Sequence, residues 1–128
     1  LDNVISVFKS DQTLYENYAP EKASKGNPAK NDFVGWSGLF PISIMFEYVF
    51  GIRPQAKQHK IVWNVRLLEK HGVKNYPLDG LSVDLICEER ATENDEPIIT
   101  AICDKPIEIE IRYANKRKTI YTSTKNNF

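Results

Sequence analysis

The sequence has no excess charge of either sign, and it lacks any long uninterrupted apolar run. Its 17 Lys and Arg residues balance its 17 Asp and Glu residues, which excludes a broad electrostatic attraction to nucleic acid or to an anionic membrane. The longest strongly apolar stretch, Leu39 to Ile52, is interrupted by Pro41, Ser43 and Glu47. A helix that crosses a bilayer needs about 20 apolar residues, so we expect no membrane span and no nucleic-acid partner.

Cysteine and histidine are also scarce. His59 and His71 have no cysteine or carboxylate near them at metal-ligand spacing, so we expect exposed turn histidines and no metal. There is no Gly-rich phosphate loop either, and no cofactor is expected. We place Cys87 and Cys103 on two strands of a hairpin that turns near Asn94. A symmetric register does not put them opposite each other, which favours two free buried thiols over a disulfide.

Signals of export and of a chain start are missing as well. The sequence opens on Leu-Asp-Asn without Met, and no basic segment is followed by an apolar one, so no signal peptide is visible. We interpret the chain as a piece of a longer parent protein, whose front end would carry any export signal. The compartment stays open: we favour the periplasm or the cell exterior for the parent protein, with the cytoplasm as the alternative.

What the sequence does have is a front part organised around Thr13 to Pro54. Before it, Leu1, Val4, Ile5 and Phe8 recur at helical spacing, which predicts an amphipathic helix of about two to three turns. A helix this short is marginal alone and needs a packing partner.

A polar segment and a second helix follow. Residues 20–31 have no periodicity and combine glycine and proline with small polar residues, which predicts a surface loop of lid-like length. Ser37 suits a helix N-cap, with Pro41 in the first turn and Gly51 as a C-cap signal. The helix between them is apolar over most of its circumference, so we expect it to be buried between layers. Pro54 should stop any continuation.

Beyond Gln55 the apolar period changes from 3.6 to 2, which indicates strands. Asp79-Gly80 between two such runs is the strongest hairpin-turn signal. The sequence therefore predicts an α+β fold: two helices packed on a C-terminal antiparallel β-sandwich-like domain of about six strands. The predicted domains are residues 1–54 and 55–128. The predicted strands cover residues 61–65, 73–78, 81–87, 98–103, 107–113 and 119–123.

The side-chain pattern also predicts how the strands are buried. Residues 107–113 alternate apolar side chains with Glu108, Glu110 and Arg112, which we expect to face solvent. Residues 98–103 are apolar or small on both sides, so that strand should be buried on both faces. Two charged clusters, residues 88–90 and 116–118, are typical of solvated strand ends, and the last four residues should be frayed.

Glu16 is the candidate catalytic residue, because it is a carboxylate in an aromatic setting just before the lid-like loop. Tyr18, Phe33 and Trp36 could form a stacking surface for a sugar ring, since carbohydrate faces present C–H groups to aromatic planes. Asp32, at the exit of the loop, is a second candidate acid. Plainer interpretations stay open for each: a solvated glutamate at a helix end, aromatic core residues, and a capping or surface aspartate.

Three segments carry a resemblance to known enzymes. Residues 14–21 (LYENYAPE), 32–38 (DFVGWSG) and 48–54 (YVFGIRP) resemble the end of six-hairpin, (α/α)6-toroid glycosidases. The nearest groups are the trehalase-like and glucosidase-I-like families 37 and 63, as found in gut bacteria of the Bacteroides type. The part that runs from Trp-Ser-Gly to Gly-Ile-Arg-Pro also looks like the closing segment of the α-L-rhamnosidases. The fold implied for the two helices is the last hairpin of such a toroid.

The resemblance implies a role for each candidate. Glu16 would be the general base, residues 21–32 a lid over the sugar, and Phe33, Gly35 and Trp36 the lining of the pocket. The general acid of these inverting enzymes is an aspartate from an earlier hairpin, which this chain does not contain. Inversion needs an acid and a base about 6.5–9.5 Å apart, so we expect the parent protein to hydrolyse α-linked sugars and this chain alone to be inactive. The long glycine run of the trehalase loop is missing, so trehalose is not indicated as the substrate.

Two other functions also fit the pattern. A non-catalytic carbohydrate-binding or structural β-domain would use its strands for contacts, and an exposed row of Tyr113 and Tyr121 would favour it. A protein-interaction module would bury the exposed helix face in a homodimer, because a large exposed apolar patch seeks cover. The partners expected are therefore a carbohydrate substrate in the parent protein and a second copy of this chain.

Overall fold

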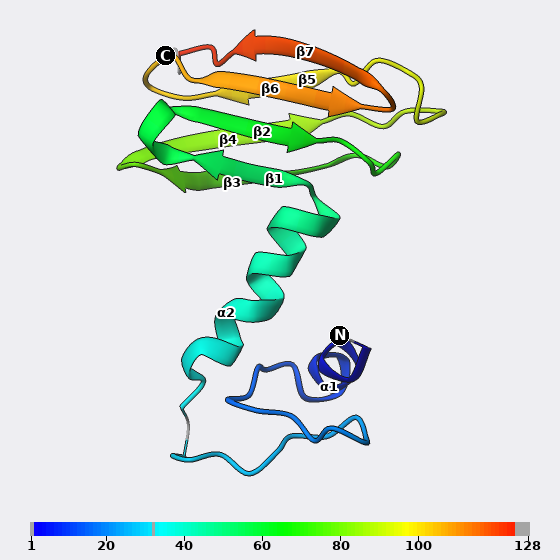
Figure 1. Ribbon diagram of the computed structural model, residues 1–128, viewed down its shortest axis with the longest axis vertical. Coiled ribbons are helices and arrows are strands. Elements are labelled where there is room, and N and C mark those ends of the chain that lie inside the picture. The colour runs from blue at the N-terminus through cyan, green and yellow to red at the C-terminus, as the bar shows by residue number, and fades with distance from the viewer. Residues whose placement is uncertain (1, 32, 125–128) are drawn as a thin grey trace. The chain divides into compact units, whose positions relative to one another are not determined.

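The computed structural model describes residues 2–31 and 33–124, and the chain divides into two compact units, Leu1–Met45 and Phe46–Phe128 (Figure 1). Over the described residues the fold is α+β, with two short α-helices and two sheets of mostly antiparallel strands. Three predictions lie outside the described residues: Leu1 on the apolar face of the first helix, Asp32 as a second acid, and a frayed end at residues 125–128. Among the residues that are described, no helix is both long enough and apolar enough to cross a membrane.

The first helix, α1 (Asp2–Asp11), confirms the predicted element but not its predicted buried face. Val7 is its buried residue, whereas Ile5 and Phe8 are 43% and 45% exposed. Apolar residues lie on more than one stripe of this helix, so periodicity alone does not determine which stripe packs. The helix ends where Gln12 adopts a left-handed φ of 55° and donates its N–H to the Phe8 carbonyl.

The second helix, α2 (Gly35–Ile44), begins two residues before the predicted cap Ser37 and passes into a π-helical turn, η1 (Met45–Val49). Pro41 is therefore the seventh residue of α2 and not part of its first turn. A proline at that position removes an intrahelical donor. The predicted burial is wrong: η1 has no buried residue, and Trp36 and Leu39 are 90% and 68% exposed.

All six predicted strands are present in the second unit, together with one that was missed. The strands are β1 (Ile52–Gln55), β2 (Lys60–Asn64), β3 (His71–Leu78), β4 (Leu81–Cys87), β5 (Ile99–Ile102), β6 (Glu108–Tyr113) and β7 (Lys116–Tyr121), with a 3-10 turn, η2 (Ala56–Gln58), after β1. The missed strand is β1, where the sequence predicts the end of a helix; it tolerates Pro54 because it is an edge strand. The four-stranded sheet has the order β1-β2-β6-β7 and the three-stranded sheet the order β3-β4-β5.

The prediction that every pair is antiparallel is wrong for β2 and β6, which pair in parallel. The chain leaves β2, forms the whole three-stranded sheet, and then returns to lie beside β2 in the same direction. The predicted hairpin at Asp79-Gly80 is confirmed, because both residues have the positive φ of a type I′ turn, 48° and 74°.

One hydrophobic cluster takes buried side chains from both sheets, and Figure 1 draws β3 and β4 behind β1 and β2. Trp63 is its largest fully buried side chain. Cys87 pairs with Ile99 in the register of β4 and β5, and both cysteines are free and buried. The prediction that residues 98–103 are buried on both faces is wrong, since only one face meets the cluster and Ile98 is 68% exposed.

Within the second unit, two hydrogen bonds join the end of the helix to β2. Gly51, the predicted C-cap signal, has a φ of 76°, as a residue that terminates a helix often does. The indole N–H of Trp63 donates to the Phe50 carbonyl at 2.8 Å, and the Asn64 N–H donates to the Gly51 carbonyl at 2.9 Å. These bonds satisfy carbonyls that the end of a helix leaves free.

Candidate functional site

Glu16 lies in the irregular segment after α1, where its carboxylate binds the backbone of the loop that follows. Its Oε2 accepts a hydrogen bond from the Ala29 N–H at 2.7 Å. The neighbouring Asn17 donates from Nδ2 to the Asn27 carbonyl at 2.8 Å. The loop is therefore folded back onto the two residues at the centre of the candidate site.

The predicted surface loop, residues 20–31, is confirmed as irregular, and most of it is exposed. Backbone hydrogen bonds hold it at two further points, from Ala19 N–H to the Ser24 carbonyl and from Gly26 N–H to the Asn17 carbonyl. A Cβ atom on Gly26 would lie 2.2 Å from Oδ1 of Asn17. A larger residue at that position would displace the Asn17 side chain.

A hollow of about 620 Å³ opens between this loop and the residues before it, entirely within the first unit. Its walls include Tyr15, Glu16, Asn17, Lys25 and Phe33. The hollow combines a carboxylate, an amide, an ammonium group and aromatic rings, which are the group types that fix the orientation of a polar ligand.

Of the predicted site residues, the structure brings Glu16 and Phe33 to this hollow, while Tyr18 and Trp36 lie outside its wall. Phe33 is 49% exposed and Trp36 is 90% exposed on α2. The Tyr18 hydroxyl accepts a hydrogen bond from the Tyr15 N–H at 3.0 Å, and the two rings meet edge to face. Tyr18 thus contacts Tyr15, which is one of the lining residues.

The hydroxyl of Tyr15 is also held, since it donates to Oδ2 of Asp11 at 2.9 Å. This hydrogen bond is the main reason why the pKa of Tyr15 lies above its ordinary value. The phenol therefore stays protonated at neutral pH and can donate only one hydrogen bond, which Asp11 receives.

The two histidines lie in different surroundings. Among residues 2–31 and 33–124, no group of three or more His, Cys, Asp and Glu side chains could hold a metal ion. His59 is exposed, as predicted, and lies 3.8 Å from Asp79. The prediction is wrong for His71, which opens β3 and packs its ring against Phe50 and Trp63 at centroid distances of 6.3 and 5.8 Å.

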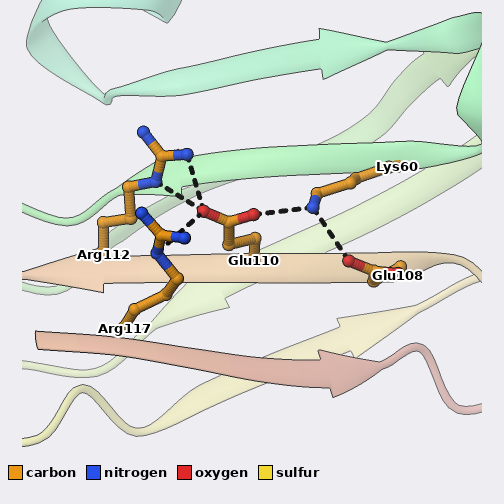
Figure 2. Close-up of polar contacts among 5 residues, drawn as sticks. All are labelled: Lys60, Glu108, Glu110, Arg112 and Arg117. Carbon is orange, nitrogen blue, oxygen red and sulfur yellow. Dashed lines mark hydrogen bonds and ion pairs between the residues drawn. The ribbon is translucent and has the colours of Figure 1, made fainter.

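A second chemical cluster, which the sequence did not predict, surrounds Glu110 on β6 (Figure 2). Glu110 is only 7% exposed, so the prediction that it faces solvent is wrong. Its Oε2 binds Lys60 Nζ at 2.6 Å, and its Oε1 binds Arg112 at 2.6 Å and Arg117 at 3.3 Å. Lys60 also bridges to Glu108 at 2.9 Å. The long side chains of three adjacent strands cover the carboxylate.

Hydrogen bonds from Lys60, and next from Arg112, lower the pKa of Glu110 from 4.5 to about 2. A carboxyl whose pKa is lower in the folded chain stabilises the fold above its unfolded pKa, and this stabilisation is lost as the pH falls from about 5 to about 2. We expect Glu110→Gln to reduce the free energy of unfolding by about 2 kcal/mol at pH 7, between the values for exposed and buried ion pairs.

Urea unfolding of wild type and Glu110→Gln at pH 7 and at about pH 2.5 checks this prediction, because the difference between them should shrink at the lower pH. Glu108→Gln is the matched control, since Glu108 contacts only Lys60 in this cluster and should cost less than about 1 kcal/mol. If Glu110→Gln lowered the free energy of unfolding equally at both pH values, the stabilisation would not depend on ionisation of Glu110.

Arg90 corrects another prediction, because it is not a solvated strand end. Its guanidinium donates to the backbone carbonyls of Val65, Leu67, Glu93 and Asp95 at 2.9 to 3.3 Å. The side chain thereby ties the connection after β2 to the connection after β4. The planar fork of arginine donors suits several carbonyl acceptors at once.

The chemistry-bearing groups of the described residues thus gather in two places, the hollow beside Glu16 in the first unit and the ion-pair cluster around Glu110 in the second. The first holds an open space beside a carboxylate. The second is closed by its own side chains. Comparisons with protein-family models, with curated proteins and with solved structures find no match to this chain.

Proposed function

We propose that this chain is the C-terminal part of an inverting glycoside hydrolase that acts on α-linked sugars, with Glu16 as its general base. The observation that carries the proposal is that Glu16 and Phe33 line the same hollow of about 620 Å³, together with Asn17 and Lys25. A sugar needs hydrogen-bonding groups for its hydroxyls and an apolar ring for its C–H face, and this wall supplies both kinds.

In this proposal Phe33 binds the substrate and residues 21–31 close over it, whereas Tyr18 and Trp36, the other two predicted binding residues, lie outside the wall of the hollow. The carboxylate of Glu16 would activate a water molecule on the face of the sugar opposite the leaving group. A carboxylic acid elsewhere in the parent protein would protonate the leaving oxygen from about 6.5–9.5 Å away. Because one carboxylate supplies only half of this mechanism, the 128-residue chain would be inactive by itself.

The proposal extends to the fold. The two helices would be the last hairpin of an (α/α)6 toroid, and the two sheets of Phe46–Phe128 would form a β-sandwich. The shared hydrophobic cluster of the two sheets supports the sandwich, because such a core is what packed sheets bury. The resemblance of residues 14–21, 32–38 and 48–54 to the toroid glycosidases supports the hairpin.

The test is a hydrolysis screen of the full-length parent protein against α-linked disaccharides and aryl α-glycosides. We expect Glu16→Gln to lower kcat/KM on any cleaved substrate by about 10²- to 10⁴-fold, the usual contribution of a general base. Glu89→Gln, an exposed carboxylate of the second unit, is the matched control and should keep wild-type activity. Full hydrolysis by Glu16→Gln would refute the proposal.

The alternative, a non-catalytic carbohydrate-binding or structural β-domain, gains no support from its predicted aromatic row. Tyr121 is 66% exposed, but Tyr113 is only 8% exposed, so the two do not form an exposed row. Absence of cleavage of every substrate in the screen would favour this alternative. A homodimer through the helix face stays a proposal, which rests on the exposure of Trp36 and Leu39.

A further inference from the structure

The loop beside the hollow is fastened to the proposed base itself. Ala29 donates its N–H to Oε2 of Glu16 at 2.7 Å, and Asn17 holds the Asn27 carbonyl, two residues earlier in the loop, at 2.8 Å. The Gly26 N–H adds a bond to the Asn17 carbonyl at 3.0 Å. Glu16 and Asn17 therefore clamp the second half of the loop, residues 26–29.

We propose that the backbone N–H of Ala29 is the positioning group for the Glu16 carboxylate, so that closing the loop and orienting the base are one event. This inference rests on the proposed function. A hydrogen bond to a carboxylate is charge-assisted and directional, so it restricts rotation of the carboxylate. With Oε2 held by Ala29, Oε1 is the oxygen left to accept a proton from a water molecule.

The arrangement has a consequence for the order of events at the site. When the loop opens, the Ala29 N–H leaves and the Glu16 side chain regains its rotamers, so the base is oriented only while residues 26–29 stay bound to it. Enzymes that close loops over a substrate commonly complete their catalytic groups in the same step. Here the completing group is a main-chain donor, which sequence motifs of side chains do not reveal.

The clamp can be tested in the 128-residue chain without any activity, by limited trypsin digestion after Lys25 and Lys30. Glu16→Gln keeps a carbonyl oxygen that can accept from Ala29, whereas Glu16→Ala removes the acceptor. We expect cleavage in Glu16→Ala to be about fivefold faster than in wild type and cleavage in Glu16→Gln to stay within about twofold, since one hydrogen bond is lost only in the first. Cleavage after Lys57, in the second unit, is the internal reference. Equal loop cleavage in wild type and Glu16→Ala would overturn the inference.

The positioning role is tested in the full-length protein by removing the donor. Ala29→Pro has no N–H, and Ala29→Gly keeps it. We expect Ala29→Pro to lower kcat by about tenfold with KM within about threefold, because orientation of the base acts on the chemical step. Ala29→Gly should restore most of kcat. Equal kcat values for the two variants would overturn the positioning role.

The two levels of the proposal fail in distinguishable ways. If the full-length protein cleaves no substrate, the proposed function fails, while the trypsin result still decides whether Glu16 clamps the loop. If Glu16→Gln abolishes hydrolysis but Glu16→Ala leaves loop cleavage unchanged, the base assignment holds and the clamp is wrong.

Discussion

Replacing Gly51 with alanine is expected to lower the free energy of unfolding of residues 46–128 by about 4 kcal/mol. Gly51 has a φ of 76°, where an L-residue costs about 1–2 kcal/mol. An added Cβ would also lie 2.0 Å from the Asn64 carbonyl oxygen, inside the distance at which atoms can pack. That oxygen belongs to the backbone at the end of β2, so relief requires a backbone shift, which costs about another 1–3 kcal/mol.

Gly80→Ala is the matched control for this experiment. Gly80 has nearly the same φ, 74°, but an added Cβ there would meet no atom within 4 Å. Urea unfolding should therefore show a loss of only about 1–2 kcal/mol for Gly80→Ala, from the backbone conformation alone. The difference between the two variants measures the close approach of Gly51 to β2. Equal losses of unfolding free energy in the two variants would show that the backbone near Gly51 shifts to accommodate the added Cβ at little energetic cost.

Truncating Trp63 to alanine is expected to have a comparably large effect, about 4 kcal/mol. Trp63 is 0% exposed, and its indole N–H donates to the Phe50 carbonyl at 2.8 Å. The truncation removes a large apolar group from the shared core and also leaves the Phe50 carbonyl without its donor. Trp63→Phe keeps most of the ring and should lose about half as much.

The same substitution at Trp36 is the control, because Trp36 is 90% exposed. Truncation of an exposed side chain usually changes the free energy of unfolding by less than about 0.5 kcal/mol. Circular dichroism during urea unfolding follows all three variants, since each keeps the strands that give the signal. A large loss for Trp36→Ala would mean that its side chain is covered in solution, as the proposed homodimer requires.

The strands could be predicted because their information is local. Alternation of side chains and the Asp79-Gly80 turn identified six strands and the β3–β4 hairpin. The strand β1 was missed because Gly51 and Pro54 also form a helix stop signal, and nothing local shows that the chain then pairs with β2. The parallel pairing of β2 with β6 joins residues about 48 apart, such as Lys60 and Glu108, and leaves no trace in either segment.

The candidate site also combines features that local sequence reveals with features that it does not. Glu16 and Phe33 lie close enough in sequence for their motifs to suggest a common wall, and both line the hollow. The donor that binds Glu16 is a backbone N–H, which carries no residue-type signal. One feature of the sequence does point to the cluster around Glu110. A tight turn after Tyr113 places Arg112 opposite Arg117. Two like charges directly opposite each other are unfavourable unless an anion lies between them. Lys60 could not be added without knowing the parallel pair.

The two buried cysteines make the second unit measurable by chemical labelling. Cys87 ends β4 and Cys103 follows β5, and the sequence has no other cysteine. Burial raises the pKa of the Cys87 thiol above its ordinary value, which slows its reaction with disulfide reagents further. Modification must therefore await local opening of the strands, so its rate measures how often the three-stranded sheet opens locally.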